Sequence, residues 1–205
     1  MDVVRGRGEL AADDAVLLGK VVHRHHHARE VATRHRQIAR LLGAQRILVT
    51  AGNEAKLARA RELGATHGIL YNQGDFVRAA REATQGEGVD VVFDHVGGET
   101  FERSLKLLKR GGRIVLCGAT SGHDVRINLR ALFFKQLSVL GSTMGSLAEL
   151  ASLLPYFASG ALRPVVDRTF PLAEAPAAQE FLARRGAFGK LVLTVREPNY
   201  AVALR

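Results

Sequence analysis

Glycines and small hydroxyl-bearing residues recur directly after the short apolar runs of this chain. Small side chains let a flat ligand approach the backbone, and hydroxyl and free N–H groups can bind its ribose, phosphate and amide groups. One such segment alone indicates only a turn, because glycine is a common turn former. Five of them favour a ligand-binding edge over turns alone. The segments are Thr50–Asn53, Tyr71, Asp94–Gly98, Gly118–Gly122 and Gly141–Thr143.

The elements that position these segments alternate regularly from residue 46 onward. Short Val/Ile/Leu runs are followed by longer segments of helical period, which is typical of parallel β-α-β units. Ligands of open parallel sheets bind at the carboxyl ends of the strands, where these segments fall. The pattern predicts strands at 47–49, 68–71, 89–93, 113–117, 137–140 and 191–195, and helices at 54–63, 75–83, 99–108, 129–134, 147–159 and 172–185. Before residue 46, it indicates a strand within 15–22 and a helix at 28–42.

Composition sets the class of protein. With 205 residues, of which 47% are hydrophobic and 24% charged, the chain can form a real core. The single cysteine, Cys117, excludes an internal disulfide and a Cys-rich zinc site, and fits a reducing compartment. No apolar run approaches the ~20 residues that span a bilayer, and residues 1–20 contain four acidic side chains. We therefore expect a cytoplasmic protein without a membrane partner.

The net charge of +9 raises the question of a nucleic-acid partner. The basic residues are mixed with acidic ones along most of the chain, and their only dense stretch is 21–46. No aromatic stacking platform accompanies them. Solvated helix faces explain most of this charge, so we expect no nucleic-acid partner.

Histidine and cysteine side chains offer further candidates for chemistry. His23, His25, His26 and His27 could give two imidazoles to a metal ion, but no cysteine ligand is nearby in the sequence, which favours a solvated run and no native zinc site. His95, at the end of a central strand, could transfer a proton or form a structural hydrogen bond, and the structural role is favoured. Cys117 ends an apolar strand, where a buried thiol is inert packing.

Residues 34–195 resemble the cofactor-binding domain of the medium-chain dehydrogenase/reductase superfamily, in its zinc-independent quinone oxidoreductase branch, which is related to zinc-type alcohol dehydrogenases. The resemblance implies an α/β, Rossmann-like doubly wound parallel sheet and an NADPH-dependent oxidoreductase acting on a small-molecule acceptor such as a quinone or enone. It also implies a homodimer that pairs through the strand near Leu137–Leu140. The segments that carry it are 37–44, 50–57, 62–65, 90–98, 111–115 and 188–193.

The resemblance also assigns cofactor-binding residues. NAD-selective members place an acidic residue after the second strand to bind the ribose 2′-hydroxyl, whereas this chain has Ala51 there, which favours NADP. Gly52, Asn53, Lys56 and Tyr71 would hold the 2′-phosphate, although an ordinary helix lysine and strand-end tyrosine would give the same pattern. The other implied residues are His95 and Val96 on the adenosine side, Gly118, Thr120 and Ser142 on the nicotinamide half, and Lys190 at the far end. No catalytic residue is implied.

The chain departs from the family pattern in its first part. A basic, His-rich segment at 1–33 precedes the resembling region, and 196–205 has the character of a tail. The family's β-rich catalytic domain has no counterpart here, and the Gly-rich phosphate turn corresponds to about residues 23–36, with no glycine between Gly19 and Gly43. A truncated gene, a shifted reading frame or a mis-assigned start would each produce this change. The alternative to a weakly active or inactive cofactor-binding portion is a non-catalytic dimerisation or binding remnant.

The missing glycines generate a testable prediction. Because Cβ atoms at 23–36 would keep the backbone away from the pyrophosphate, we expect the native chain to bind NADPH weakly or not at all. Replacing residues 23–33 with a Gly-rich turn of the family type should raise the affinity at least tenfold, about 1.4 kcal/mol, in a fluorescence titration. Submicromolar binding by the native chain would contradict the prediction and would indicate that Arg24, Arg29 or Arg34 binds the phosphates.

Overall fold

The computed structural model describes residues 15–18, 28–184 and 187–195. The chain divides into two compact units, Met1–Arg163 and Pro164–Arg205. This division differs from the predicted one, because the predicted boundary after residue 33 falls inside a helix and a strand at 15–18 already belongs to the main sheet.

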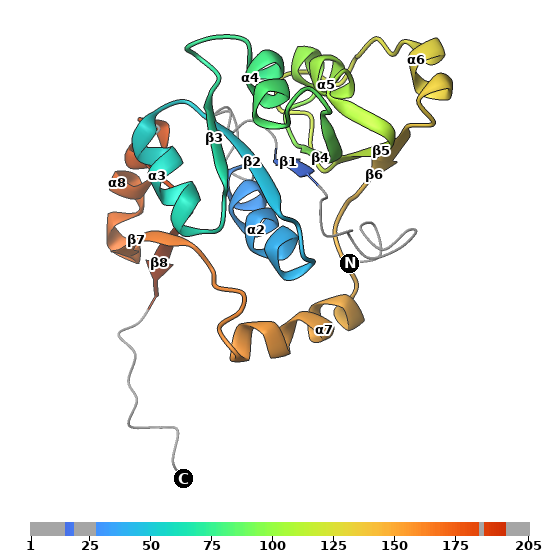
Figure 1. Cartoon of the computed structure of the whole chain (residues 1–205). Coiled ribbons are helices and arrows are strands. Elements are labelled where there is room, and N and C mark those ends of the chain that lie inside the picture. The colour runs from blue at the N-terminus through green and yellow to red at the C-terminus, as the bar shows by residue number, and fades with distance from the viewer. Residues whose placement is uncertain (1–14, 19–27, 185–186, 196–205) are drawn as a thin grey trace. The chain divides into compact units, whose positions relative to one another are not determined.

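The first unit contains a six-stranded sheet whose strand pairs are all parallel (Figure 1). The strand order is β3-β2-β1-β4-β5-β6. The chain therefore builds outward from β1 to β3 and then crosses back to place β4 on the other side of β1, as in doubly wound nucleotide-binding folds. The strands are β1 (Ala15–Leu18), β2 (Arg46–Ala51), β3 (His67–Leu70), β4 (Val89–Asp94), β5 (Leu108–Leu116) and β6 (Ser138–Gly141). This arrangement confirms the predicted fold class.

Helices cover both faces of this sheet because each strand carries apolar residues on both parities. On one face, Ala39 of α2 and Ala60 of α3 pack with Ile47, Val91 and other strand residues. On the other face, Phe76 of α4 and Phe101 of α5 pack with Leu48, Val92 and Ile114. The helices of this unit are α2 (Ala28–Leu41), α3 (Glu54–Glu62), α4 (Phe76–Ala83), α5 (Gly98–Leu105), α6 (Leu129–Phe134) and α7 (Leu147–Ala158).

Short polar side chains start several of these helices. Asn53 accepts a hydrogen bond from the Lys56 backbone N–H, and Asp75 accepts one from Val77. Ser146 and Glu149 form a reciprocal capping box at α7. Such caps satisfy backbone donors that the helix itself leaves unpaired, so the predicted helix starts agree with the structure to within a residue or two.

Helix α2 carries one side chain that contacts the centre of the sheet and a neighbouring one that is buried. The His35 ring stacks on Phe93 of β4, with ring centroids 4.3 Å apart and planes 15° apart. The neighbouring Arg36 side chain is fully buried, and this loss of solvent lowers the pKa of its guanidinium to about 10. A charged group on α2 is thus enclosed by the protein, where desolvation is costly.

Two elements differ from the sequence prediction. The helix predicted at 99–108 ends at Leu105, because Leu107 and Leu108 turn into the sheet as buried residues and β5 begins at Leu108. The strand β5 is also longer than predicted, with a register irregularity opposite Val89–Val91 and Gly111 at φ 76°.

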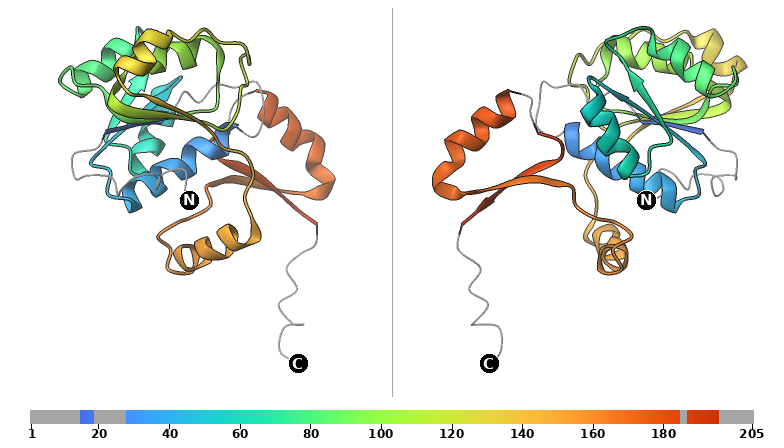
Figure 2. Two further views of the ribbon diagram at one scale, coloured as in Figure 1. Left: turned by 90° about the vertical axis from the view of Figure 1, so that its right-hand side faces the viewer. Right: turned by 60° about the vertical axis from the view of Figure 1, so that its left-hand side comes forward.

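The second unit is a small β-α-β arrangement of its own (Figure 2). β7 (Val166–Pro171) pairs in parallel with β8 (Lys190–Thr194), and the 3-10 turn η1 (Leu172–Glu174) and helix α8 (Ala175–Ala183) connect them. Gly189 has φ 105°, and a Cβ atom there would lie 2.4 Å from the Val165 carbonyl oxygen. The sequence predicted the helix and β8 but missed β7, and the predicted tail at 196–205 lies outside the described residues.

Candidate functional site

The residues predicted to bind a cofactor in the first unit all follow the carboxyl ends of its strands. They form three groups: Gly52, Asn53, Lys56 and Tyr71 after β2 and β3; His95, Val96, Gly118 and Thr120 after β4 and β5; and Ser142 after β6. Lys190 begins β8 in the other unit, so its assignment to the cofactor stays a prediction.

The first group forms a compact arrangement around the end of β2. The Tyr71 backbone N–H donates to the Ala51 carbonyl, and the Asn72 side chain donates to the Gly52 carbonyl over 3.0 Å. A Cβ atom at residue 52 would lie 2.8 Å from the Tyr71 hydroxyl oxygen. Glycine at residue 52 therefore lets the tyrosine hydroxyl lie directly against the backbone.

Asn53 and Lys56 lie on the first turn of α3 but differ in exposure. Asn53 is exposed, and its side-chain oxygen accepts the Lys56 backbone N–H over 3.0 Å. The Lys56 residue is only 8% exposed. The alternative of an ordinary solvent-exposed helix lysine is therefore excluded, and the assignment of Lys56 to the 2′-phosphate stays a prediction.

The second group is held together by hydrogen bonds between the loops that follow β4 and β5. The Ser121 backbone N–H and hydroxyl both donate to the Val96 carbonyl, over 2.8 and 2.9 Å. The Thr120 hydroxyl donates to the His95 carbonyl over 3.3 Å. His95 itself is 2% exposed, and a Cβ atom at Gly118 would lie 3.1 Å from its carbonyl oxygen. Glycine at residue 118 therefore allows the two loops to pack closely, and this role does not require a ligand.

Asp94 organises this pair of loops, and the sequence reasoning did not select it. Its Oδ1 atom accepts the backbone N–H groups of Val96 and Gly97, over 2.7 and 3.1 Å. The residue is fully buried, and burial raises the pKa of its carboxyl group although the two hydrogen bonds act in the opposite direction. An aspartate at the end of an apolar strand, two residues before a turn N–H, is the signal that could have identified it.

Two glycines allow the same loops to approach each other. Gly98 donates its N–H to the Gly122 carbonyl, and a Cβ atom at Gly97, whose φ is 72°, would lie 2.4 Å from the same oxygen. Only glycine tolerates both the positive φ and this contact.

Cys117 follows β5 next to this site, and its thiol donates to the Asp94 carbonyl over 3.7 Å. Burial, together with the negative charge of Asp94, raises the pKa of the thiol to about 11. The thiol is therefore protonated at neutral pH, which agrees with the prediction that Cys117 is inert.

The predicted phosphate turn at about 23–36 needs a correction. Residues 28–36 belong to helix α2, so only the residues between β1 and α2 can form that turn. Those residues, 19–27, lie outside the described residues, as do Arg24 and the histidines at 23 and 25–27. Within the described ranges, no three His, Cys, Asp or Glu side chains gather into a group that could hold a metal ion. The predicted lack of a native zinc site stays a prediction.

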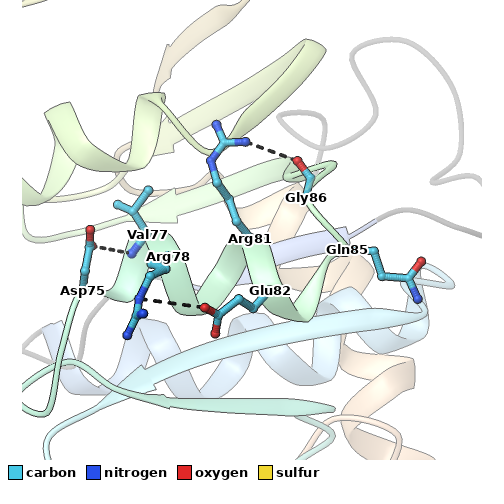
Figure 3. Close-up of a pocket in the computed structure, with 7 residues that line it drawn as sticks. All are labelled: Asp75, Val77, Arg78, Arg81, Glu82, Gln85 and Gly86. Carbon is cyan, nitrogen blue, oxygen red and sulfur yellow. Dashed lines mark hydrogen bonds and ion pairs between the residues drawn. The ribbon is translucent and has the colours of Figure 1, made fainter.

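A pocket of about 420 Å³ on the outer side of α4 contains none of these residues (Figure 3). Its charged side chains are already bonded to near neighbours: Arg81 donates to the Gly86 carbonyl over 3.2 Å, and Arg78 lies 3.8 Å from Glu82. The hydrogen bond from Val77, together with Arg103, lowers the pKa of Asp75. This pocket therefore offers no free charge to a cofactor.

Each helix in the described part of the chain is too short or too polar to cross a membrane.

The buried carboxyl group of Asp94 gives a prediction about stability. Asp94→Ala removes the acceptor of two backbone N–H groups and should lower the free energy of unfolding by about 2–4 kcal/mol. Asp94→Asn keeps the Oδ1 acceptor and removes the buried charge. Because the pKa of Asp94 is higher in the folded state than in the unfolded state, ionisation of this carboxyl group destabilises the folded protein. The stability that protonated Asp94 contributes is therefore fully present at low pH, below the pKa of the unfolded state, and is lost as the pH rises through the pKa of the folded state.

Urea unfolding from pH 4 to 8 measures this effect. The stability of Asp94→Asn relative to wild type should increase as pH rises, whereas Asp94→Ala should be less stable at every pH. A difference between wild type and Asp94→Asn that does not change with pH would show that burial does not dominate this carboxyl group.

Comparison with known proteins agrees with this architecture. The model of the zinc-binding dehydrogenase family matches residues 35–159. The chain is 35% identical over 165 residues to 2-haloacrylate reductase of Burkholderia sp., covering 76% of this chain and 49% of the relative. It is 34% identical over 168 residues to quinone oxidoreductase 1 of Escherichia coli K12, covering 77% of this chain and 51% of the relative. The chain thus spans about half the length of these two relatives.

Solved structures give the same result. A crystal structure of an NAD-dependent alcohol dehydrogenase superposes with a TM-score of 0.80 at 38% identity, over 95% of this chain and 54% of that one. Escherichia coli quinone oxidoreductase in complex with NADPH superposes with a TM-score of 0.71 at 32% identity, over 88% of this chain and 57% of that one. The family match covers more than half of the chain, and the strand order and sequence identities agree with it, so the chain belongs to the zinc-binding dehydrogenase family of the medium-chain dehydrogenase/reductase superfamily.

Proposed function

We propose that this chain is the cofactor-binding portion of an NADP(H)-dependent oxidoreductase. The observation that carries the proposal is the strand order β3-β2-β1-β4-β5-β6 with glycine, amide and hydroxyl residues after the carboxyl ends of its strands. Dinucleotides bind at this edge of doubly wound sheets, across the point where the strand order reverses. When bound, the cofactor would supply a hydride to an acceptor of the quinone or enone class, and the protein would supply its position.

The residues at the end of β2 favour NADP(H) over NAD(H). Ala51 is the last residue of β2, and no carboxylate takes the place that would bind a 2′-hydroxyl there. Gly52, the exposed Asn53 and the Tyr71 hydroxyl lie together beside it and leave room for a 2′-phosphate, with Lys56 on the same helical turn. The E. coli relative crystallised with NADPH supports this choice, while the NAD-dependent alcohol dehydrogenase shows that related chains use the other cofactor.

The remaining residues would divide between the two ends of the cofactor. His95 and Val96 would lie toward the adenosine, and Gly118, Thr120 and Ser142 toward the nicotinamide. We propose that affinity is low, because the residues between β1 and α2, 19–27, contain one glycine, Gly19, where the family has a Gly-rich phosphate turn.

Cofactor choice can be tested with Asn53→Asp. The aspartate keeps the cap on α3, since it can still accept the Lys56 N–H, but it adds a negative charge where the 2′-phosphate would lie. Isothermal titration calorimetry with millimolar cofactor should show NADPH weakened at least tenfold, ~1.4 kcal/mol, with NADH little changed.

Asn128→Asp is the matched control, because Asn128 caps α6 in the same way by accepting the Ala131 N–H over 3.0 Å. It should leave both cofactors unaffected. If Asn53→Asp lowered the affinity for NADPH and for NADH equally, the residues at the end of β2 would not bind the 2′-phosphate.

We further propose that two copies of the chain pair through β6, the last strand of the sheet. Its neighbourhood exposes large apolar side chains, which favours burial against a partner. They are Leu129, Phe133, Phe134, Val139, Met144 and Leu147. Pairing of this kind is also what the alternative function, a non-catalytic dimerisation or binding remnant, would require. NADPH binding in a fluorescence titration together with turnover of a model quinone would support the enzyme, whereas a dimer that shows neither would support the remnant.

Val139→Lys tests the pairing. Val139 is 37% exposed on β6, and two lysines facing each other across paired edge strands would repel. Analytical ultracentrifugation should show the dimer dissociation constant raised at least tenfold, ~1.4 kcal/mol. Val192→Lys, at a valine 38% exposed on β8, is the control and should not change it. A monomeric wild-type chain would contradict the proposed pairing directly.

A further inference from the structure

A pocket of about 630 Å³ lies between α5 and α6, away from all the residues assigned to the cofactor. Its volume is within the range of small-molecule sites. Helix α5, the segment before α6, and α6 itself form its walls. The lining residues are Glu102, Leu105, Lys106, Arg126, Ile127, Asn128, Ala131, Leu132, Lys135 and Leu137.

The apolar part of this α5–α6 pocket is anchored on the core. Leu105, Ile127 and Leu137 are partly buried and pack against the hydrophobic cluster that contains Phe101 and Ile114. Their positions are therefore fixed by the sheet, and the apolar surface they leave exposed is a built feature of the fold.

The wall between α5 and α6 is fixed by a hydrogen bond. The Glu102 side chain accepts the Arg126 backbone N–H over 2.7 Å, which holds the segment before α6 against α5. This bond places the Arg126 side chain on the same pocket as Lys106, one turn along α5 from Glu102.

Three cations line the pocket against a single carboxylate. Among the residues that the structure describes, Lys106, Arg126 and Lys135 form no ion pair. The Lys135 ammonium donates one hydrogen bond to the Leu108 carbonyl over 2.8 Å and retains two further donors. Burial, and then the charge of Arg81, lowers the pKa of this ammonium, so a negative ligand would relieve an unfavourable local charge.

We propose that the α5–α6 pocket binds a small amphipathic carboxylate, with its apolar body on Leu105, Ile127 and Leu137 and its carboxylate between Lys106, Arg126 and Lys135. A charge-assisted hydrogen bond would orient the carboxylate of the ligand. The apolar side chains that line the pocket would bury its hydrocarbon body. This inference does not depend on cofactor binding, because no residue is shared between the two sites.

Isothermal titration calorimetry with octanoate tests the proposal on the full chain. Octanoate should bind, and octylammonium, which has the same apolar body and the opposite charge, should bind at least tenfold more weakly. The titration should give the same result with and without millimolar NADPH. Equal affinity for the two ligands would indicate adsorption to exposed apolar surface and would overturn the proposal, as would the absence of octanoate binding.

Variants locate the site. The double variant Lys106→Gln/Arg126→Gln removes two of the cations and should weaken octanoate at least tenfold. Arg130→Gln is the matched control, since Arg130 is exposed on α6 outside the pocket and its guanidinium lies over the Phe134 ring. Ala131→Trp fills the pocket and should abolish binding while circular dichroism confirms the fold. Unchanged affinity in both the double variant and Ala131→Trp would place octanoate elsewhere.

Discussion

The six strands of the larger sheet run in one direction, and this parallel pairing determines where every candidate functional residue lies. Hydrogen bonding in register, such as Val49 with Gly68 and Phe93 with Val115, brings the carboxyl ends of successive strands to one edge. Connections that are distant in sequence therefore meet there. The close approach of Gly97 to Gly122 and of Tyr71 to Gly52 follows from that alignment and from the absence of a Cβ atom at the contacts.

Sequence reasoning predicted those parts of the fold in which local chemistry and burial agree. Asn53 was predicted to start a helix because a short amide side chain can accept a backbone N–H there, and the structure shows that bond. The run Val89–Phe93 was predicted to be central because it is apolar on both parities, and β4 is indeed covered on both faces. By contrast, β7 contains Asp167, Arg168 and Thr169 and ends in Pro171, so its apolar pattern is too weak to predict a strand. This segment is a strand because its backbone pairs with β8.

The candidate site was predictable as a set of loops but not as a set of interactions. Lys56 has the sequence context of a surface lysine, and only the packing of α3 on the sheet shows that it is buried. Asp94 was passed over because a single carboxylate in a turn carries no chemical signature, although it holds the turn by two backbone hydrogen bonds. The helix at 28–42 was predicted from the sequence, but the stacking of His35 on Phe93 and the burial of Arg36 were not, because nothing in a run of basic residues distinguishes a buried side chain from a solvated one.

The position of β1 has a consequence for the order in which the chain folds. Among the described residues, β1 is the first strand in chain order, but its partners are β2 on one side and β4 on the other, with Leu18 opposite both Val49 and Phe93. Closing the second of these ladders joins residues more than seventy positions apart, and such non-local pairing slows folding because loop entropy is lost before contacts compensate. During synthesis, β1 can pair with β2 early, but the ladder between β1 and β4 can close only after Asp94 has emerged from the ribosome.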